Sequence, residues 1–378
     1  MLSGLRKSAS FRSTKSLVPN RLASSHTKTG TSHLDVDQHD YKVHKVHRYF
    51  KSERREEVNT QCSKSILASH SKTGTSHLDI EQYDYTVSKL RDFFKNKGWK
   101  EVNTQYRKSI LAACEDPETV STFEYEGQVW PLPQTGQMWL EHDLLKNPDV
   151  EGVFTVSTSY RSEPDPIPGR HQTIFPMFEF EGRGDLVNLR NTERDLLRHL
   201  GFGKKDPFVT MNYDKASKTY NADIIEDLEE GKLCTDYGPV VFLERFPEHT
   251  SPFWNMYWER YGIEHEADGK KVWEQVTHAR KIDVIIHGQE TIGSAEREIS
   301  PEVMRERFET TSDGAYAQKL RDLFGEERVN QELENFLTLD FCQRFGGGIG
   351  IHRLMRGMQL ENIMEPVREP LYKDYSWV

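Results

Sequence analysis

Apolar and polar residues alternate along the chain in runs that predict its main elements. An apolar stripe with helical spacing follows Asp79, and Gly98 is a typical helix stop. Strands are expected at 99–104, 153–160, 173–181 and 281–287, and helices at 188–200, 300–308 and 313–324. Because these elements do not follow a strict βαβ rhythm, the sequence predicts an α+β domain with an antiparallel sheet.

Residues 25–68 and 69–112 form a tandem repeat that aligns without gaps. In this alignment 27 of 44 positions are identical. The second copy has the helix stop Gly98 and the apolar anchor Trp99, whereas the first copy has two arginines at these places. Two copies are too few for a solenoid. We therefore interpret 25–68 as a degenerate duplicate and expect the main domain to span 69–378.

The N-terminal segment 1–24 differs from the rest of the chain in composition. It is basic and rich in serine, and no acidic residue precedes Asp35. This composition is typical of an organellar transit peptide, so we expect a mitochondrial or other organellar location. A disordered tail on a cytoplasmic protein is the alternative.

Composition narrows the classes of function for the remaining chain. The net charge of -10 argues against a nucleic-acid-binding surface that covers the whole protein, although a local basic patch remains open. No apolar run approaches the roughly 20 residues of a membrane helix. The four cysteines lie far apart without a CxxC pair, so the sequence indicates neither a zinc site nor a disulfide framework.

The first cluster of candidate chemistry is Arg161 and Glu163, followed by the polar loop 164–170. An arginine at a strand end can hold a phosphate, because its guanidinium has several donors in a fixed plane. Glu163 can accept hydrogen bonds from a base or an amine. The alternative is a surface hairpin with an exposed ion pair.

The second cluster is Asp283, Glu290 and Arg297, which are spaced by seven residues each. A buried carboxylate pair needs a cation, and Mg²⁺ that also bridges nucleotide phosphates meets this need. Arg297 can bind an acidic substrate through two N–H groups. A structural network of ion pairs is the alternative.

The third cluster is the glycine-rich run 345–350, which precedes an amphipathic stretch containing Arg353. Backbone amides at a helix start favour anions. The run is neither the dinucleotide-binding fingerprint nor a P-loop, because the required downstream acid and the Gly-Lys-Ser/Thr sequence are missing.

Together and in this order, the three clusters resemble the class II catalytic core of the aspartyl-, asparaginyl- and lysyl-tRNA synthetases. The resemblance covers about residues 70–368. It implies an antiparallel sheet flanked by helices, ATP and Mg²⁺ as cofactors, and a homodimer formed through 79–110. One departure concerns the family's first motif, which usually has a proline where this chain has Gln105 or its neighbours.

The resemblance also implies a role for each motif residue. Arg161 would hold the ATP α-phosphate, Arg353 the γ-phosphate, and Phe175 would stack on adenine. The residues implied to bind ATP are Arg161, Glu163, His171, Phe175, Glu290, Gly348, Gly350 and Arg353. The implied catalytic residues are Arg161, Glu163 and Arg353, and the metal ligands are Asp283 and Glu290. The amino acid would be bound by Gln134, Gln137 and Arg297.

The reaction implied is activation of an amino acid by ATP to an aminoacyl-adenylate. Arg297 favours aspartate or asparagine over lysine, because a lysine pocket needs carboxylates there. We expect tRNA as the acceptor, and the segment 137–141 resembles the asparaginyl-tRNA enzymes. A non-catalytic nucleotide-binding paralogue is a hypothesis of another class, and the retained Arg161 and Glu290 argue against it.

An ammonia-dependent asparagine synthetase that uses no tRNA is the alternative within the same family. Three features favour it. The chain before residue 69 has no room for an anticodon-binding barrel, and the run 346–350 resembles the asparagine synthetase version of the third motif. Ile174 also stands where tRNA-charging members have an acid.

Overall fold

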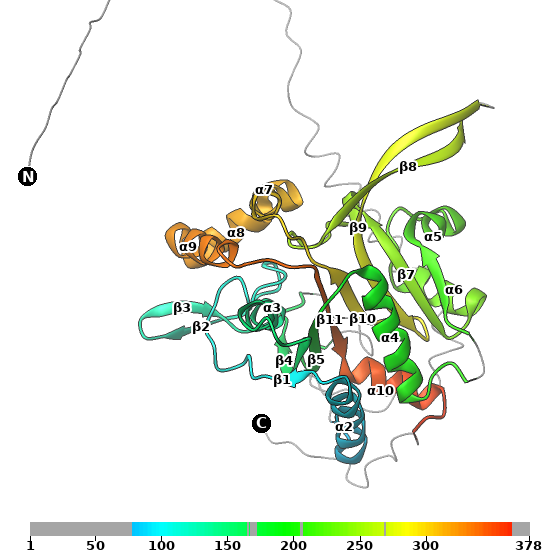
Figure 1. Ribbon diagram of the computed structural model, residues 1–378, viewed down its shortest axis with the longest axis horizontal. Coiled ribbons are helices and arrows are strands. Elements are labelled where there is room, and N and C mark those ends of the chain that lie inside the picture. Colours follow the sequence, from blue (N-terminus) through cyan, green and yellow to red (C-terminus); the bar gives the residue numbers. More distant parts are fainter. Residues whose placement is uncertain (1–77, 165, 167–171, 205–206, 268–269, 365–378) are drawn as a thin grey trace, which may run out of the picture. The chain divides into compact units, whose positions relative to one another are not determined.

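The computed structural model describes residues 78–364, apart from 165, 167–171, 205–206 and 268–269 (Figure 1). The predicted tail, the first repeat copy and His171 therefore lie outside the described residues. The helices are α2 (Ile80–Asn96), α3 (Gln137–Lys146), α4 (Leu186–Leu200), α5 (Tyr213–Tyr220), α6 (Asp227–Tyr237), α7 (Pro301–Thr310), α8 (Ala315–Phe324), α9 (Glu326–Leu337) and α10 (Ile351–Leu360). The strands are β1 (Lys100–Glu101), β2 (Thr122–Tyr125), β3 (Gln128–Pro131), β4 (Gly152–Tyr160), β5 (Ile174–Arg183), β6 (Val209–Asn212), β7 (Val240–Pro247), β8 (Trp258–Ala267), β9 (Lys270–Ile286), β10 (Gln289–Glu296) and β11 (Arg344–Gly350).

A nine-stranded sheet forms the centre of the described domain. Its order is β1-β4-β5-β11-β10-β9-β7-β6, and β8 pairs with the outer part of β9. The pairs β1–β4 and β6–β7 are parallel, and the other pairs in this sheet are antiparallel. The prediction of an α+β domain with a mostly antiparallel sheet is thus confirmed.

Most predicted elements form, with two corrections. Asp79 caps α2 by accepting a hydrogen bond from the backbone N–H of Gln82, and Gly98 follows the helix with φ of 81°. The predicted strand 99–104 shrinks to β1, because the segment after it runs in turns and bends. The helix predicted from 313 begins only at Ala315, because Ser312 and Asp313 have left-handed φ/ψ.

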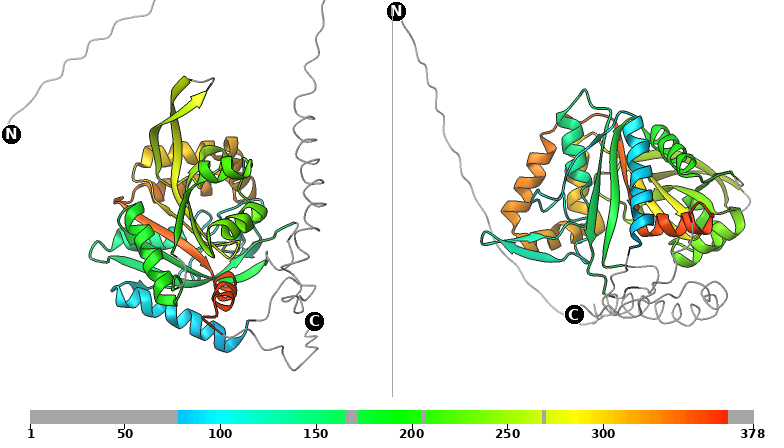
Figure 2. Two further views of the ribbon diagram at one scale, coloured as in Figure 1. Left: turned by 90° about the vertical axis from the view of Figure 1, so that its right-hand side faces the viewer. Right: turned by 90° about the horizontal axis from the view of Figure 1, so that it is seen from below.

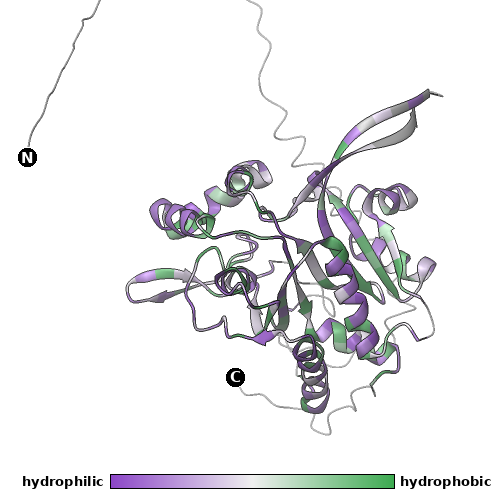
Figure 3. Ribbon diagram, viewed as in Figure 1, coloured by the Kyte–Doolittle hydropathy of each residue, from purple (hydrophilic) through white to green (hydrophobic). Residues whose placement is uncertain are grey.

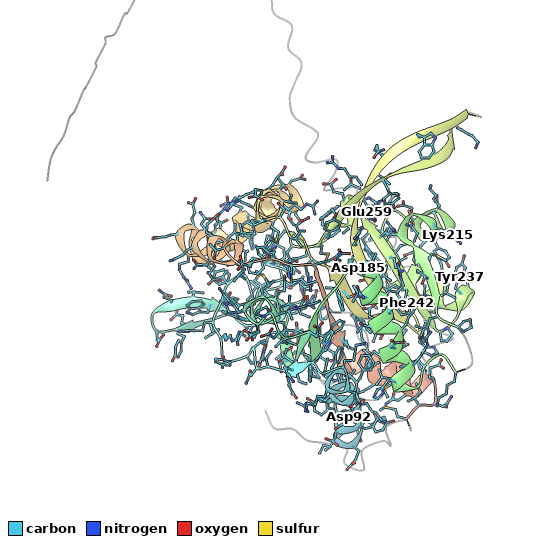
Figure 4. The ribbon with its side chains drawn as sticks, viewed as in Figure 1. Asp92, Asp185, Lys215, Tyr237, Phe242 and Glu259 are labelled. Carbon is cyan, nitrogen blue, oxygen red and sulfur yellow. The ribbon has the colours of Figure 1, made fainter. Side chains whose placement is uncertain are left out.

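One face of the sheet is covered by α2, α4 and α10, which close the main hydrophobic core. Phe154, Phe178 and Phe345 come from the strands and pack with the inner faces of these helices. Phe242 in β7, labelled in Figure 4, belongs to the same core. Figure 3 shows that α4 and α10 each have a hydrophobic and a hydrophilic side. The core therefore sits on this side of the sheet.

Among the described residues, two groups of helices pack near the two ends of the opposite face. At one end α3 packs on β4 and β5 through Leu140 and Leu144, and at the other end α5 and α6 cover β7 through Tyr213 and Leu233. The helices α7–α9 form a second core with the residues around Trp254. In the right-hand view of Figure 2, α7–α9 and α2 lie on opposite sides of the strands. The middle of this face, on β10 and β11, lies between these groups of helices.

The hairpin of β8 and β9 extends away from the sheet (Figure 1). At its base Glu259, labelled in Figure 4, accepts hydrogen bonds from Arg245 and Arg280. Arg280 in turn donates to Glu296, so ion pairs anchor the hairpin to β10. Within the described part of the chain, no helix is long and apolar enough to span a bilayer.

Candidate active site

The open face of the sheet is built from small and polar residues that stand in one row across four strands. Asp283 on β9 pairs with Gly293 on β10, which pairs with Gly348 on β11, which pairs with Glu179 on β5. Because side chains alternate along a strand, these residues share one face while their neighbours enter the core. Because Gly293 and Gly348 have no side chains, only their backbone lies between the two acids, and we call this backbone the floor of the site.

Arg297 lies at the end of β10 above this floor and is almost completely buried. Its Nε and Nη2 donate to Oε1 of Glu181, at 2.9 and 2.5 Å, and its Nη2 also donates to Oε1 of Gln137 at 2.7 Å. Burial raises the pKa of Glu181, while Arg297 opposes the shift. Two of the predicted amino-acid ligands, Arg297 and Gln137, are therefore in direct contact.

The glycine at 346 makes the position of Glu181 possible. A Cβ atom at Gly346 would overlap the Glu181 carboxylate. Gly348 gives similar room, because a Cβ there would lie 2.7 Å from Cε of Met177 and 3.4 Å from Nε2 of Gln137. The glycine-rich run is thus a strand whose bare backbone lets acidic and amide side chains cross it.

Glu179 is a second buried carboxylate of the site. It accepts hydrogen bonds from Thr135 and Ser157, each at 2.5 Å, and from the backbone N–H of Gly136 at 3.0 Å. Burial raises its pKa, and these donors lower it. The Glu179 carboxylate is completely buried, and these three donors hold it beside Gly348.

Gln134 has a different environment from the one predicted. Its Oε1 accepts from the backbone N–H groups of Glu115 and Asp116, and its Nε2 donates to the Asp116 carbonyl and the Thr119 hydroxyl. The amide is fully buried and makes all four of its hydrogen bonds to this loop. In this arrangement Gln134 holds the loop 115–119, and its direct contact with an amino acid stays a prediction.

The loop held by Gln134 reaches the first predicted phosphate ligand. Nη2 of Arg161 donates to the carboxylate of Glu115. The charge of Glu115 raises the pKa of Arg161, burial opposes this shift, and Glu290 adds to it. Glu163 is half-buried two residues further along and also raises the pKa of Arg161. Arg161 therefore faces the acids of the site.

Glu290 and Asp283 lie on the same face of the sheet, because Glu290 pairs with Ile285, which is two residues from Asp283 on β9. A bulge between Glu290 and Ile292 shifts the register, so that Gly293 also lies on this face and pairs with Asp283. A Cβ at Gly293 would lie 2.7 Å from Oε1 of Glu290 and 3.7 Å from Oδ1 of Asp283. Both oxygens thus border the space above one glycine.

This arrangement fits a divalent cation. Oδ1 of Asp283 is buried and has no hydrogen-bond partner among the described residues, while Oδ2 binds Nζ of Lys281. Carboxylate oxygens are the ligands that Mg²⁺ prefers, and it usually adds water and phosphate oxygens to one or two of them. No cluster of three or more His, Cys, Asp or Glu side chains suited to a metal ion occurs in the described ranges. Asp283 and Glu290 would therefore need those further ligands.

Arg353 lies in the first turn of α10 and closes the site next to Glu290. Its Nη1 donates to the carbonyl of Glu290 at 2.6 Å and lies 3.9 Å from the carboxylate. Gly350 is the residue before α10, and a Cβ there would make only ordinary contacts with Arg353. Phe175 on β5 is half-buried and pairs with Ser159. The contacts of Arg353, Gly350 and Phe175 with ATP stay predictions.

Several acids and one lysine of the site were not predicted from the sequence. They are Glu115, Glu141, Glu179, Glu181 and Lys281. Glu179 and Glu181 had a usable signal, because acids at i and i+2 of an apolar strand must face the same side. Glu141 had none, because its partner Arg344 lies 203 residues away.

A recess of the described surface lies beside the site. A cavity of about 90 Å³ is bounded by residues 104–109 and by Trp130, Thr135 and Trp139. Thr135, one of the residues that line it, donates to Glu179 of the site.

Comparison with known proteins adds to this geometry. Residues 58–368 match the family of class II tRNA synthetases specific for D, K and N. A 104-residue stretch is 28% identical to an aspartate–tRNA(Asp/Asn) ligase of Campylobacter concisus, which is 26% of this chain and 17% of that protein.

Solved structures of similar fold come from several organisms. An asparaginyl-tRNA synthetase from Pyrococcus horikoshii, complexed with asparaginyl-adenylate, aligns with a TM-score of 0.56 and 20% identity over 75% of this chain and 66% of that one. The asparaginyl-tRNA synthetase of Entamoeba histolytica aligns with a TM-score of 0.54 and 16% identity over 75% and 64%. For a putative aspartyl-tRNA synthetase of Leishmania major these values are 0.54, 19%, 75% and 62%.

The chain thus spans a sixth of the curated relative and slightly less than two thirds of these solved proteins. The fold agrees with the resemblance seen in the three sequence clusters, which is confirmed. Since the family match covers most of its length, the chain belongs to the class II tRNA synthetases of the aspartate, lysine and asparagine group.

Proposed function

We propose that this protein is an ATP-dependent ligase that activates aspartate or asparagine to an aminoacyl-adenylate and transfers the aminoacyl group to tRNA. The observation that carries the proposal is the shared face on which Arg161, Arg353, the Asp283–Glu290 pair and Arg297 gather. Two arginines and a cation site suit a triphosphate, and the buried Arg297 suits a polar amino-acid side chain.

Little covalent chemistry is required of the protein in such a reaction. Arg161 would bind the α-phosphate at which the amino-acid carboxylate attacks, and Arg353 would bind the departing phosphates. Mg²⁺, when bound to Asp283 and Glu290, supplies positive charge where negative charge builds up. Alignment of carboxylate and phosphorus on the rigid floor of β5 and β11 would contribute much of the rest.

The surroundings of Arg297 favour asparagine over aspartate. Glu181 already supplies a counter-charge to Arg297, and Oε1 of Glu141 lies 3.9 Å from its Nε. An aspartate carboxylate would add a negative charge next to both acids, whereas an asparagine amide adds none. Nη1 of Arg297 makes no hydrogen bond to any described residue, so it can donate to an amide oxygen.

ATP–pyrophosphate exchange with each of the twenty amino acids tests the proposal, followed by addition of total tRNA or of ammonia. Exchange with asparagine or aspartate that ends in charged tRNA would support it. Exchange with aspartate, and free asparagine only when ammonia is added, would replace it with a stand-alone asparagine synthetase. No exchange with any amino acid would refute the ligase activity.

Arg297→Ala gives the matching test of the amino-acid pocket. We expect loss of the exchange that depends on asparagine or aspartate. The exposed Arg305 on α7, which pairs with Glu334, provides the control Arg305→Ala. An unchanged KM for the amino acid in Arg297→Ala would remove Arg297 from the pocket.

A further inference from the structure

Lys281 is a cation inside the proposed nucleotide site that the reaction described above does not use. It lies two residues before Asp283 on β9, so both side chains leave the strand on the same face. Its Nζ is 2.8 Å from Oδ2 of Asp283 and 4.0 Å from the centre of the Phe246 ring. The ammonium is therefore held between a carboxylate and an aromatic face.

The surroundings keep this ammonium in place and charged. Phe246 is buried in the core under α5 and α6, so it is a rigid wall, and the contact of a cation with its ring is favourable. The ion pair with Asp283 favours the charged form of the lysine.

The ion pair changes what the cation site offers. Oδ2 of Asp283 is occupied by Lys281, so only Oδ1 faces the space above Gly293 that Glu290 also borders. Lys281 also neutralises one of the two negative charges of the Asp283–Glu290 pair. A divalent cation placed there meets a permanent positive charge a few ångströms away, which weakens its binding.

We propose that Lys281 is a positioning residue that makes divalent-cation binding depend on the nucleotide. Lys281 holds Asp283 with its Oδ1 toward the space above Gly293, and its charge keeps the carboxylate pair from retaining a metal ion in the absence of nucleotide. The phosphates of ATP then supply the missing negative charge and ligands, so metal and nucleotide bind together. This inference rests on the proposed nucleotide site.

Binding of Mn²⁺ to the full chain, measured by electron paramagnetic resonance or calorimetry, tests the proposal without any turnover. Each protein is titrated with Mn²⁺ alone and with Mn²⁺ in the presence of a non-hydrolysable ATP analogue. The variants are Lys281→Gln, which keeps a donor but removes the charge, and Lys281→Arg, which keeps the charge. Lys232→Gln, at an exposed lysine that pairs with Glu229 on α6, is the control.

We expect wild-type protein to bind Mn²⁺ at least about tenfold more tightly with the analogue than without it. Lys281→Gln should bind Mn²⁺ alone at least about tenfold more tightly than wild type, the effect of one nearby charge even at the dielectric constant of water. Lys281→Arg and the control should resemble wild type. Unchanged or weaker binding of Mn²⁺ alone to Lys281→Gln would overturn the proposal and leave Lys281 as a structural partner of Asp283.

If circular dichroism shows that Lys281→Gln does not fold, the wild-type titration alone tests whether Mn²⁺ binding depends on the nucleotide. Equal Mn²⁺ affinity with and without the analogue in the wild type would also overturn the proposal. Failure of the ligase hypothesis would look different, because pyrophosphate exchange would be missing while the difference in Mn²⁺ binding remained.

Discussion

Glu115 forms an ion pair with Arg161, the arginine expected to hold the α-phosphate, and Gln134 holds the backbone of Glu115 in place. A phosphate must therefore compete with this carboxylate for the guanidinium. We expect Glu115→Gln to lower the KM for ATP about three- to fivefold, the scale of a partly exposed ion pair. The measurement is pyrophosphate exchange at varied ATP. Glu118→Gln is the control, since Glu118 lies on the same loop and pairs with Lys319. A KM that stays unchanged or rises would show that Glu115 does not compete.

Arg344 and Glu141 form a fully buried pair next to Arg297. Nε and Nη2 of Arg344 donate to Oε2 of Glu141 at 2.9 and 2.5 Å, and its Nη1 donates to the Glu298 carbonyl at 3.0 Å. Arg344→Ala leaves a buried carboxylate without its partner, so we expect the free energy of unfolding to fall by about 3–5 kcal/mol. Urea denaturation measures this loss. Arg305→Ala, at an exposed pair, should change stability little, and a similar loss in both variants would contradict the prediction.

Glu193 is a buried acid on the core side of the sheet whose pKa is raised to about 8, mainly by burial. The Ser294 hydroxyl lies 2.6 Å from Glu193 and 3.2 Å from the Ile282 carbonyl. Because that hydroxyl has one proton, a protonated Glu193 can donate to Ser294 while Ser294 donates to Ile282. Above its ordinary pKa of 4.5, only the folded chain keeps this proton. The stability that it contributes is therefore complete below pH 4.5 and is lost as the pH rises toward 8.

Glu193→Gln should remove this pH dependence. We expect its free energy of unfolding to change less than that of wild type between pH 5 and pH 8, and to exceed the wild-type value at pH 8. Urea unfolding at several pH values provides the comparison, with Glu327→Gln on the exposed side of α9 as control. The same slope in Glu193→Gln and wild type would mean that Glu193 is ionised in the folded protein.

Gly346→Ala should separate substrate binding from nucleotide binding. The added Cβ would overlap the Glu181 carboxylate and displace the counter-charge of Arg297. Misplacement of a binding group by about 1 Å can cost 10²-fold in rate, so we expect kcat/KM for the amino acid to fall at least tenfold. Gly231→Ala in α6 is the control, because a Cβ there meets nothing within 4 Å. Equal effects on the ATP and amino-acid parameters would argue against a local role of Gly346.

The elements with clear apolar spacing could be predicted because their own residues determine them. Phe178 and Phe180 alternate with two glutamates and enter the core from β5, as the pattern indicates. The position of Gly293 on the same face as Glu290 depends instead on a bulge, which the spacing of residues in the sequence does not predict. Gln134 was expected to contact substrate, yet its four partners belong to a loop that folds back over it. Partners of this kind depend on tertiary contacts, and a single sequence does not reveal them.

The bare backbone of β11 beneath the site limits how this protein can change during evolution. Gly346 and Gly348 are each crossed by a side chain from another element, so almost any substitution there removes an existing contact. New substrate preferences must therefore arise on the elements around these glycines, which are β5, α3 and the loop 115–119. Side chains there can be exchanged without placing a Cβ atom on β11. Relatives with other amino-acid specificities should accordingly differ on these surrounding elements while they keep glycine at the positions of Gly346 and Gly348.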